Sequence, residues 1–548
     1  MERRLSCAPR DDNILLSVSL VHAPLSLGVP PASIFPAEHI SKQKSTEKLF
    51  DADRRFFMSV LSSNKKLGYH GPRGMARYDI PEVPESDKKF SPGIKSITEV
   101  QRETKVLCEA DVIVVGGGPG GVAAAIAAAR AGARTVLLER YGHLGGMATG
   151  GLVNIIPNLS NVYGEHLIGG LCHEFIERLK ADDAAFAPDP DEWGTTDPQC
   201  LKYYMDSSFH HFFIRKNAED KDCLIYSAIL DPEVGKNELN RMCTEAGVKL
   251  LLHSWVSDVV MDGNTVKGIV FQSKSGRQAV LGKVIIDGTG DGDLLPFSGA
   301  ESEDYIDPDL RISHLCFGVW IGGVEFRAFD KFMSSKPNEY IQLKNDLFDN
   351  GLYFNFYRGM LKNQENVAWL HPHFKTKCQT DVEEMTRMDV AGREKAIRTW
   401  EMLKERAPGF EKSFIMLTGA QLGTTGGRRL VGEYSLREPD LRRSEPFEDT
   451  IAIFPNNDRA AESLEYSKVY VPYRALIPKS VEGLMVACRA FSSDDIANAY
   501  FNLIPHCMCF GQAAGIAAAM AVEKGISVRE VPYAELKEKL LAENVILP

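Results

Sequence analysis

The pattern of apolar and polar positions divides the chain into two parts. Residues 1–100 mix Pro, Ser, Lys and short apolar patches, and no period of 2 or 3.6 is sustained across them. Residues 41–90 carry many charges and few aliphatic runs. This composition predicts an N-terminal extension over residues 1–107 that is poorly packed in part.

The extension has two interpretations, an export signal and a later start of translation. Residues 13–30 are apolar and follow a pair of arginines, as in a secretion signal, but an acidic pair precedes the apolar part and Pro24 interrupts it. We therefore do not expect export. The alternative is that translation begins at Met75, which the intact mass of the native protein would decide.

Regular periods begin at about residue 108. Residues 110–115 form a continuous apolar run, which is typical of a strand buried on both faces. A glycine cluster, an Ala-rich helical stretch to about Gly132 and a second apolar strand over residues 135–139 follow. This strand–helix–strand order is typical of an α/β fold with a parallel sheet.

The rest of the pattern predicts helices over residues 167–179, 237–246 and 382–406, and strands over residues 248–252, 256–261, 265–272 and 278–286. The strands form a β-meander, and strand-then-helix order returns over residues 483–523. We predict an α/β fold: a discontinuous Rossmann-like nucleotide-binding domain with a parallel sheet and the meander, interrupted by an inserted α+β domain. The expected parts are residues 108–180, 224–305 and 471–548 for the nucleotide domain, 181–223 for a helical and loop insertion, and 306–470 for the inserted domain.

The composition and charge of the chain limit the kinds of partner that it can bind. The 548 residues are 44% hydrophobic and 25% charged, and the formal net charge is -11. An acidic chain repels nucleic acid and anionic membranes, so we expect neither as a partner. The 11 cysteines form no CxxC pair, so zinc and iron–sulfur sites are not expected, and no run of 18 apolar residues predicts a membrane span. We expect reduced thiols and a cytoplasmic protein.

The glycine cluster fits a phosphate-binding loop. Gly116, Gly118 and Gly121 satisfy GxGxxG, with Pro119 and Gly120 between them. The first glycine permits a tight turn, the second lets a pyrophosphate approach the backbone, and the third lets helix and strand pack closely. The helix N-terminus then offers free N–H groups to the phosphates.

An acidic residue in the expected place strengthens this interpretation. Glu139 ends the second strand, where a carboxylate suits a ribose hydroxyl pair, and Arg140 follows it. NAD and FAD share this fingerprint. Further glycine-rich segments at residues 145–151 and 287–293, and a small-residue helix over residues 511–521, lengthen the site and favour FAD. The additional cofactor-contacting candidates are Gly145, Gly146, Met147, Ala148, Thr149, Val256, Gly290, Asp291, Gly511, Gln512, Ala513, Ala514 and Gly515.

With these four ordered motifs, the chain resembles the FAD-dependent oxidoreductases of the glutathione-reductase-like two-dinucleotide superfamily, which are distantly related to the fumarate reductase flavoprotein. The resemblance covers about residues 108–523. It implies that FAD binds across all four motifs, and that the last helix points its N-terminus at the flavin, where a positive dipole end would stabilise the reduced anion.

The resemblance also bears on the reaction. Disulfide reductases of this superfamily carry CxxxxC in the loop after the ribose-binding acid, and residues 144–152 contain no cysteine. Covalent attachment uses a histidine in that loop, whereas His143 precedes it, so FAD is expected to be non-covalent. No second GxGxxG follows, so electrons are expected to come from the organic substrate or from a separate electron carrier.

The catalytic residues stay open. The candidates are His371, His373, His506, Arg428, Arg429 and Asp495, with His314, Tyr473 and Arg474 considered beside them. A base near pH 7 favours the histidines, but structurally satisfied histidines and fold-stabilising arginine ion pairs are equal alternatives. The resemblance places an Arg-Glu pair at Thr425 and Gly426, a histidine at Asp495 and an arginine at Asn502. These departures favour an uncharged substrate.

We expect an FAD-dependent dehydrogenase or reductase that transfers a hydride between flavin N5 and a small organic molecule. The alternatives are a flavoprotein subunit of a larger electron-transfer complex and a flavoprotein in which FAD has a non-redox role.

Overall fold

The computed structural model describes residues 96–205, 210–316, 318–352, 356–358, 364–376, 378–457 and 468–548. The signal-like segment, the alternative start at Met75 and most of the predicted N-terminal extension lie outside the described residues. Residues 96–104 form no regular element, and residues 96–100 are exposed.

A five-stranded parallel sheet forms the centre of the nucleotide-binding domain. Its order is β25 (Leu484–Val486), β13 (Val284–Asp287), β2 (Val112–Val115), β3 (Thr135–Leu138) and β9 (Lys249–Leu251). Val112 and Val114 pack into one core and Ile113 and Val115 into another. Both faces of β2 are therefore covered, which explains its unbroken apolar run.

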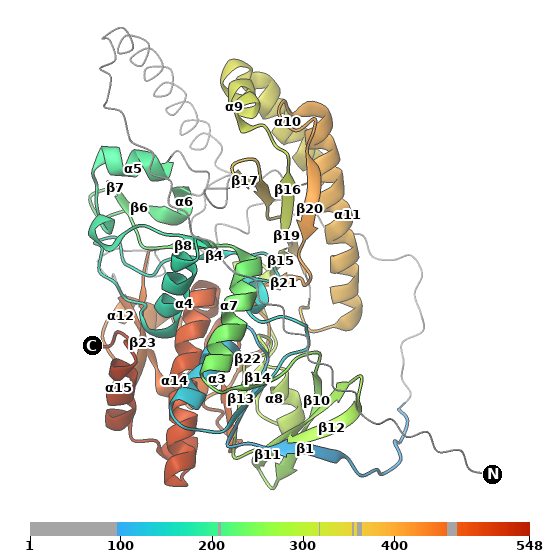
Figure 1. Ribbon diagram of the computed structural model, residues 1–548, viewed down its shortest axis with the longest axis vertical. Coiled ribbons are helices and arrows are strands. Elements are labelled where there is room, and N and C mark those ends of the chain that lie inside the picture. Colours follow the sequence, from blue (N-terminus) through green and yellow to red (C-terminus); the bar gives the residue numbers. More distant parts are fainter. Residues whose placement is uncertain are drawn as a thin grey trace, which may run out of the picture. The chain divides into compact units, whose positions relative to one another are not determined.

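Helices α3 (Pro119–Arg130) and α14 (Ile504–Lys524) share the larger of these cores and run side by side in Figure 1. Helices α4 (Gly170–Ala181), α7 (Pro232–Glu245) and α15 (Tyr533–Ala542) pack in the same core. Among the described residues, α14 alone is long and apolar enough to cross a membrane by length and composition. However, 94% of its most apolar stretch is buried inside the protein.

The meander is a four-stranded sheet of β1 (Lys105–Glu109), β12 (Gly276–Leu281), β11 (Thr265–Ser273) and β10 (Trp255–Asp262). The single strand predicted over residues 278–286 is wrong, because the chain crosses there from the meander to the central sheet. β12 ends at Leu281, and β13 begins at Val284 beside β2. β1 begins before residue 108, so residues 105–107 of the predicted extension belong to the meander.

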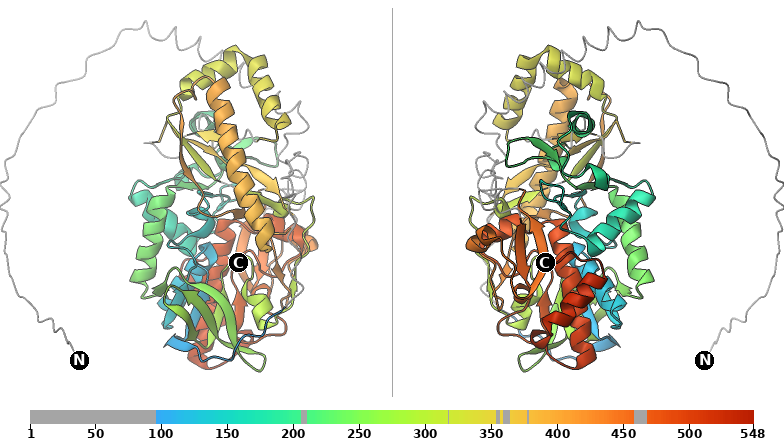
Figure 2. Two further views of the ribbon diagram at one scale, coloured as in Figure 1. Left: turned by 90° about the vertical axis from the view of Figure 1, so that its right-hand side faces the viewer. Right: turned by 90° about the vertical axis from the view of Figure 1, so that its left-hand side faces the viewer.

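The inserted domain has a core of its own and two small sheets. One sheet has the order β17 (Phe356–Arg358), β18 (Ala368–Leu370), β16 (Val319–Gly322) and β20 (Phe414–Thr418). The other has the order β19 (His373–Lys375), β15 (His314–Cys316) and β21 (Gly423–Thr424). Helices α9 (Phe326–Ser335), α10 (Pro337–Asp349) and α11 (Val382–Arg406) pack with them. α11, the long helix also visible in Figure 2, has the bounds that the sequence predicts.

Packing shifts one predicted boundary and links one predicted segment to two domains. β23 (Thr450–Pro455) and β24 (Lys468–Pro472) share their core with α14, so they belong to the nucleotide-binding domain rather than to the insertion predicted to end at residue 470. In the segment predicted as residues 181–223, Tyr204 and Phe213 pack with Trp320 and Trp369. Leu152, Ile155 and Ile229 belong to the same cluster, so that segment packs against both predicted domains.

Helix starts differ from the predicted ones by a few residues. α7 begins at Pro232 rather than at residue 237, because the Asp231 carboxylate accepts hydrogen bonds from the N–H groups of Glu233 and Val234. The remaining helices are α5 (Pro198–Met205), α6 (His210–Phe213), α8 (Leu294–Ser298), α12 (Glu438–Arg443) and α13 (Asp495–Tyr500). The remaining strands are β4 (Ile155–Ile156), β5 (Ala185–Phe186), β6 (Ile214–Lys216), β7 (Asp222–Leu224), β8 (Ala228–Leu230), β14 (Ser302–Glu303) and β22 (Arg429–Leu430). The predicted α/β class, with a parallel sheet and a meander, is confirmed.

Candidate functional site

The glycine loop joins β2 to α3, and its three motif glycines have different surroundings. Gly116 has a φ of 94°, and a Cβ there would lie 2.6 Å from the Gly288 carbonyl carbon. A Cβ on Gly121 would overlap the Gly116 carbonyl oxygen. At Gly118 the nearest atom to a Cβ would be 3.8 Å away, so the space in front of this residue is open. Backbone atoms fill the space beside Gly116 and Gly121, so of these three glycines only Gly118, at the N-terminus of α3, has open space beside it.

That open N-terminus is suited to an anion. Gly118 is the N-cap of α3 and provides no side-chain cap, and the first turn holds Pro119, Gly120 and Gly121 without any acidic residue. The N–H groups of a helix's first turn have no partner within the helix, and the helix dipole favours negative charge there. A pyrophosphate fits both requirements.

Glu139 stands at the end of β3 beside this loop. Its Oε2 accepts a hydrogen bond of 2.5 Å from the Gly117 N–H, and its Oε1 accepts one of 2.8 Å from the Tyr141 N–H. Burial raises the pKa of Glu139, and these two bonds oppose the rise. The Arg140 guanidinium lies 5.0 Å from the Tyr141 ring and 5.1 Å from the Trp255 ring. This places a carboxylate and an aromatic-backed cation at the nucleotide end.

The second glycine segment packs directly on the first. The Gly145 N–H donates a 2.8 Å hydrogen bond to the Gly117 carbonyl, and a Cβ on Gly146 would lie 3.0 Å from the Gly118 Cα. A short 3-10 turn over Gly146–Ala148 follows, and Thr149 Oγ1 donates to the Leu144 carbonyl at 2.5 Å. Met147 points onward to the inserted domain, since a Cβ on Gly423 would lie 2.8 Å from its methyl carbon.

The third segment turns tightly after β13. Asp287 is fully buried and holds the turn, because its carboxylate accepts bonds from the N–H groups of Thr289 and Leu294 at 3.0 and 2.9 Å. Asp291 accepts a 2.6 Å bond from Arg489, which follows β25, and Gly290 lies against the same guanidinium. Burial, together with Asp291 and Asp287, raises the pKa of Asp293 to about 7. The segment therefore links two strand ends of the central sheet.

The C-terminal helix corrects one expectation. α14 begins at Ile504, so Gly511 lies two turns inside it rather than at its N-terminus. Cβ atoms on Gly511 and Gly515 would overlap carbonyl oxygens of α3, and Gln512 Oε1 accepts a 2.9 Å bond from the Leu171 N–H of α4. The predicted residues Gly511, Gln512, Ala513, Ala514 and Gly515 are buried among helices, where they hold α14 against α3 and α4.

The first three glycine segments thus converge at Gly118. Half-buried Val256 of β10 pairs with buried Phe271 of β11, and both pack in the second core. Comparison with known families agrees with this geometry, because the model for the family described as FAD dependent oxidoreductase matches residues 111–540. The chain belongs to this family.

Members of the wider flavoprotein group share a short stretch with this FAD-dependent oxidoreductase. Leghemoglobin reductase of Glycine max is 42% identical over 67 residues, which cover 12% of each chain. Mitochondrial dihydrolipoyl dehydrogenase of Caenorhabditis elegans is 40% identical over 70 residues, which cover 13% of this chain and 14% of the relative. The match spans only about an eighth of these curated relatives.

Solved structures match over a longer range. The geranylgeranyl bacteriochlorophyll reductase-like protein of Thermoplasma acidophilum has a TM-score of 0.37 and 14% identity, covering 80% of this chain and 84% of that one. The p-nitrophenol 4-monooxygenase PnpA of Pseudomonas putida DLL-E4 has a TM-score of 0.39 and 10% identity, covering 80% and 85%.

Beside the cofactor segments, a three-stranded sheet of the inserted domain brings histidines toward the same place. Cys316 of β15 pairs with His373 of β19 and with Gly423 of β21, and Gly423 borders Met147. His314, two residues before Cys316, therefore shares this face of the sheet. The His314 and His373 rings lie 6.3 Å apart, and the His371 ring lies 4.7 Å from that of His373.

These histidines are held neutral. Burial lowers the pKa of His314 to about 3 and that of His373 to about 4, and burial also lowers the pKa of His371 well below its usual range. His314 is fully buried, and neither of its ring nitrogens has a hydrogen-bond partner in the described structure. A neutral imidazole in such a place can donate a hydrogen bond to a bound molecule or accept one from it.

The contacts of His506 are those of a residue that stabilises the fold. It lies in the first turn of α14 rather than before the helix, and its Nδ1 accepts a 3.3 Å bond from the Leu503 N–H. Its ring packs 4.3 Å from the Phe454 ring and 5.3 Å from the Phe501 ring. Burial lowers its pKa to about 3. These contacts favour the alternative of a structurally satisfied histidine.

The other predicted catalytic residues form contacts within the chain. Arg428 pairs with Asp304 at 3.0 Å, and Arg429 pairs with Glu303 at 3.4 Å. Asp495 is in the first turn of α13, where its carboxylate accepts a bond from the N–H of the next residue. Tyr473 donates to the Val528 carbonyl, and Arg474 pairs with Asp449. All of these contacts fit the fold-stabilising alternative.

Sequence reasoning missed two arginines. Arg489 Nη2 donates to Asp291 Oδ1 and to Thr424 Oγ1, so it joins the central sheet to β21. Arg311 Nη2 donates to Asn502 Oδ1 at 2.6 Å, and the Asn502 amide donates to the Thr425 carbonyl. Arg311 precedes β15 by only three residues, but no motif marks it, and its partner is distant in sequence.

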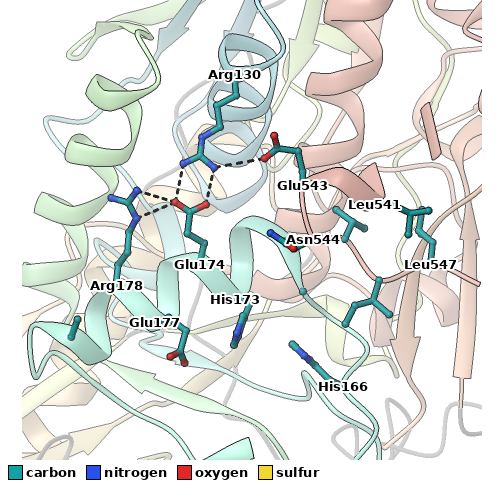
Figure 3. Close-up of a pocket in the computed structure, with 15 residues that line it drawn as sticks. Arg130, His166, His173, Glu174, Glu177, Arg178, Leu541, Glu543, Asn544 and Leu547 are labelled. Carbon is teal, nitrogen blue, oxygen red and sulfur yellow. Dashed lines mark hydrogen bonds and ion pairs between the residues drawn. The ribbon is translucent and has the colours of Figure 1, made fainter. Parts of the chain in front are cut away.

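A separate pocket of about 990 Å3 lies between α4 and the C-terminal segment (Figure 3). Arg130 pairs there with Glu174 at 2.7 Å, and Arg178 pairs with the same carboxylate at 3.0 Å. Arg130 is the last residue of α3, whereas the open glycine loop is at the first turn. This pocket is therefore at the opposite end of the helix from the candidate cofactor site.

Proposed function

We propose that the protein binds FAD non-covalently and catalyses a dehydrogenation or reduction of a small organic molecule by hydride transfer to or from flavin N5. One observation carries this proposal: the first three glycine segments meet at Gly118, where open space lies in front of a helix N-terminus. The pyrophosphate would lie there, and Glu139 would accept hydrogen bonds from the ribose hydroxyls. FAD, when bound, supplies the two-electron acceptor or donor.

We infer that the substrate binds at the junction of the second glycine segment, the β19–β15–β21 sheet and the start of α14. Met147 and Cys316 meet at Gly423, and Arg489 ties Thr424 to the cofactor domain. Neutral His314 and His373 on this sheet would hold or move a proton at the substrate's heteroatom. We propose that no dihydrolipoyl-type exchange occurs, because residues 144–152 contain no cysteine to form a redox disulfide.

Non-covalent binding is supported by the place of His143. It precedes the second glycine segment, its ring stacks on Tyr141 at 5.4 Å, and it lies against Gly150 at the far end of that segment from Gly146, which borders Gly118. Burial lowers the pKa of His143, which keeps the ring neutral.

The test begins with the absorbance spectrum of the purified protein. We expect the two visible bands of oxidised flavin, and we expect acid precipitation to release all of the FAD into the supernatant. Anaerobic screening of a metabolite library should then identify compounds that bleach the bands. A protein that stays colourless after incubation with FAD would contradict the proposal, and flavin that remains with the precipitate would contradict non-covalent binding.

A further inference from the structure

Arg311 lies where the sequence comparison finds an arginine missing. Family resemblance places an arginine at residue 502, and this chain has asparagine there. The guanidinium of Arg311 donates a 2.6 Å hydrogen bond to Asn502 Oδ1 and another bond to the Ala499 carbonyl. A cation therefore reaches this position from a different part of the chain.

This cation lacks an acidic partner. The other arginines of the region are ion-paired: Arg489 with Asp291, Arg428 with Asp304 and Arg429 with Glu303. Arg311 forms no ion pair within the described structure, and its two acceptors are a carbonyl and an amide oxygen. A guanidinium whose acceptors in the described structure are neutral oxygens keeps its full charge for an anion, which it can bind through charge-assisted hydrogen bonds.

A second observation points to a ligand at the same place. His314 begins the strand that follows the Arg311–Ser313 turn, and it is fully buried with both ring nitrogens unpartnered in the described structure. Thr425 Oγ1 lies within hydrogen-bond distance of two carbonyls, 2.8 Å from that of Arg311 and 2.7 Å from that of His314, and its single hydroxyl proton is donated to one of them or shared between them. Buried polar groups without partners are rare and call for an explanation.

The location suits a substrate. Arg311 contacts Asn502, which precedes the start of α14, and β15 runs from His314 to Cys316 beside Gly423 and Met147. We propose that Arg311 binds a carboxylate group of the substrate and that His314 donates a further hydrogen bond to it. This inference rests on the proposed function and reverses the expectation of an uncharged substrate that Asn502 and Thr425 suggested.

The test uses the flavin-loaded protein and three pairs of probes: acetate and acetamide, malonate and malonamide, benzoate and benzamide. Binding is followed by perturbation of the flavin spectrum and, independently, by the shift in melting temperature. We expect at least one acid to bind, and its amide to bind at least tenfold more weakly. Loss of a charged hydrogen-bond donor in Arg311→Met should weaken that acid about 10- to 100-fold, and Arg311→Lys should lie between.

Two further variants sharpen the test. Asn502→Asp places a carboxylate beside the guanidinium with little change of shape, so it should abolish acid binding even if Arg311→Met folds poorly. Arg241→Met removes one positive charge from α7, where Arg241 pairs with Glu238 and Asp182, and should leave acid binding unchanged.

Several outcomes would overturn the inference. They are a wild-type protein that binds none of the acids, acids and amides that bind equally, and a flavin-loaded Arg311→Met or Asn502→Asp that keeps the wild-type affinity for acids. A changed flavin potential in Arg311→Met with unchanged acid affinity would assign the cation to the flavin instead. Absence of flavin from the wild-type protein would contradict the proposed function itself, which the visible spectrum reports separately.

Discussion

Gly511 of α14 lies against the carbonyl oxygen of Gly120 in α3, so close that a Cβ atom on Gly511 would overlap that oxygen. A Cβ on Gly120 would in turn overlap the Ala487 carbonyl oxygen. The first turn of α3 is therefore clamped between α14 and the end of β25. The glycines of two distant motifs maintain one backbone contact.

We expect Gly511→Ala to destabilise the protein by about 1–3 kcal/mol, because the added methyl group must push α14 away from α3. Urea unfolding followed by circular dichroism would measure the change. The flavin content should fall with it, since the Gly120 turn carries the open N-terminus. Unchanged stability would show that the helices separate at no cost, contrary to the packing described.

Gly118→Ala should weaken FAD binding without destabilising the fold. Gly118 has an ordinary φ of -70° and room for a methyl group, so the melting temperature of flavin-free protein should change little. The methyl group would occupy the space proposed for the pyrophosphate, so FAD affinity should fall at least tenfold. Flavin fluorescence titration measures it. Normal FAD binding by this variant would place the pyrophosphate elsewhere.

Glu139→Gln should weaken FAD about 10- to 100-fold, because a hydrogen bond to a charged group is replaced by one to a neutral amide. The amide oxygen can still accept the bond from Gly117 or Tyr141, so folding should be retained. Isothermal titration with FAD and with riboflavin separates the effects. Riboflavin lacks the ribose, so a matching loss of riboflavin affinity would contradict the assignment.

His506 should make stability fall in acid. Its folded pKa is lowered to about 3, below the value near 6.5 of an unfolded histidine, so the unfolded state binds the proton first. This stabilising contribution is complete above pH 6.5 and is lost as the pH falls toward 3, by about 1.4 kcal/mol per pH unit. His506→Gln keeps a capping acceptor and should flatten the slope between pH 6.5 and 4.5. An unchanged slope would assign the proton uptake to other groups.

The sequence predicts the strand, glycine loop and helix over residues 112–130 well because their geometry is local. The turn at Gly116, the closed contact at Gly121 and the position of Glu139 all depend on residues within one strand–helix–strand unit. The small-residue pattern begins only at Gly511, whereas α14 begins at Ile504, with a proline in its first turn, where proline is tolerated.

The proposed substrate site could not be predicted in the same way. Arg311, Asn502 and Thr425 meet only through tertiary packing of a 3-10 turn, a helix start and a loop, so no spacing along the chain indicates that they are neighbours. Positional comparison registers the loss of an arginine at Asn502, but it does not detect a cation that arrives from elsewhere. The split between β12 and β13 was hidden for a related reason, since both strands are apolar and only their partners differ.

The clamp on Gly120 has a consequence for how the protein is made. The loop that would cradle the cofactor emerges early from the ribosome, yet its first helical turn rests on Ala487 and Gly511, which are translated much later. A nascent chain that carries only the first strand–helix–strand unit lacks this support. We therefore expect the described geometry of this loop to form only after residues 487–511 have been translated.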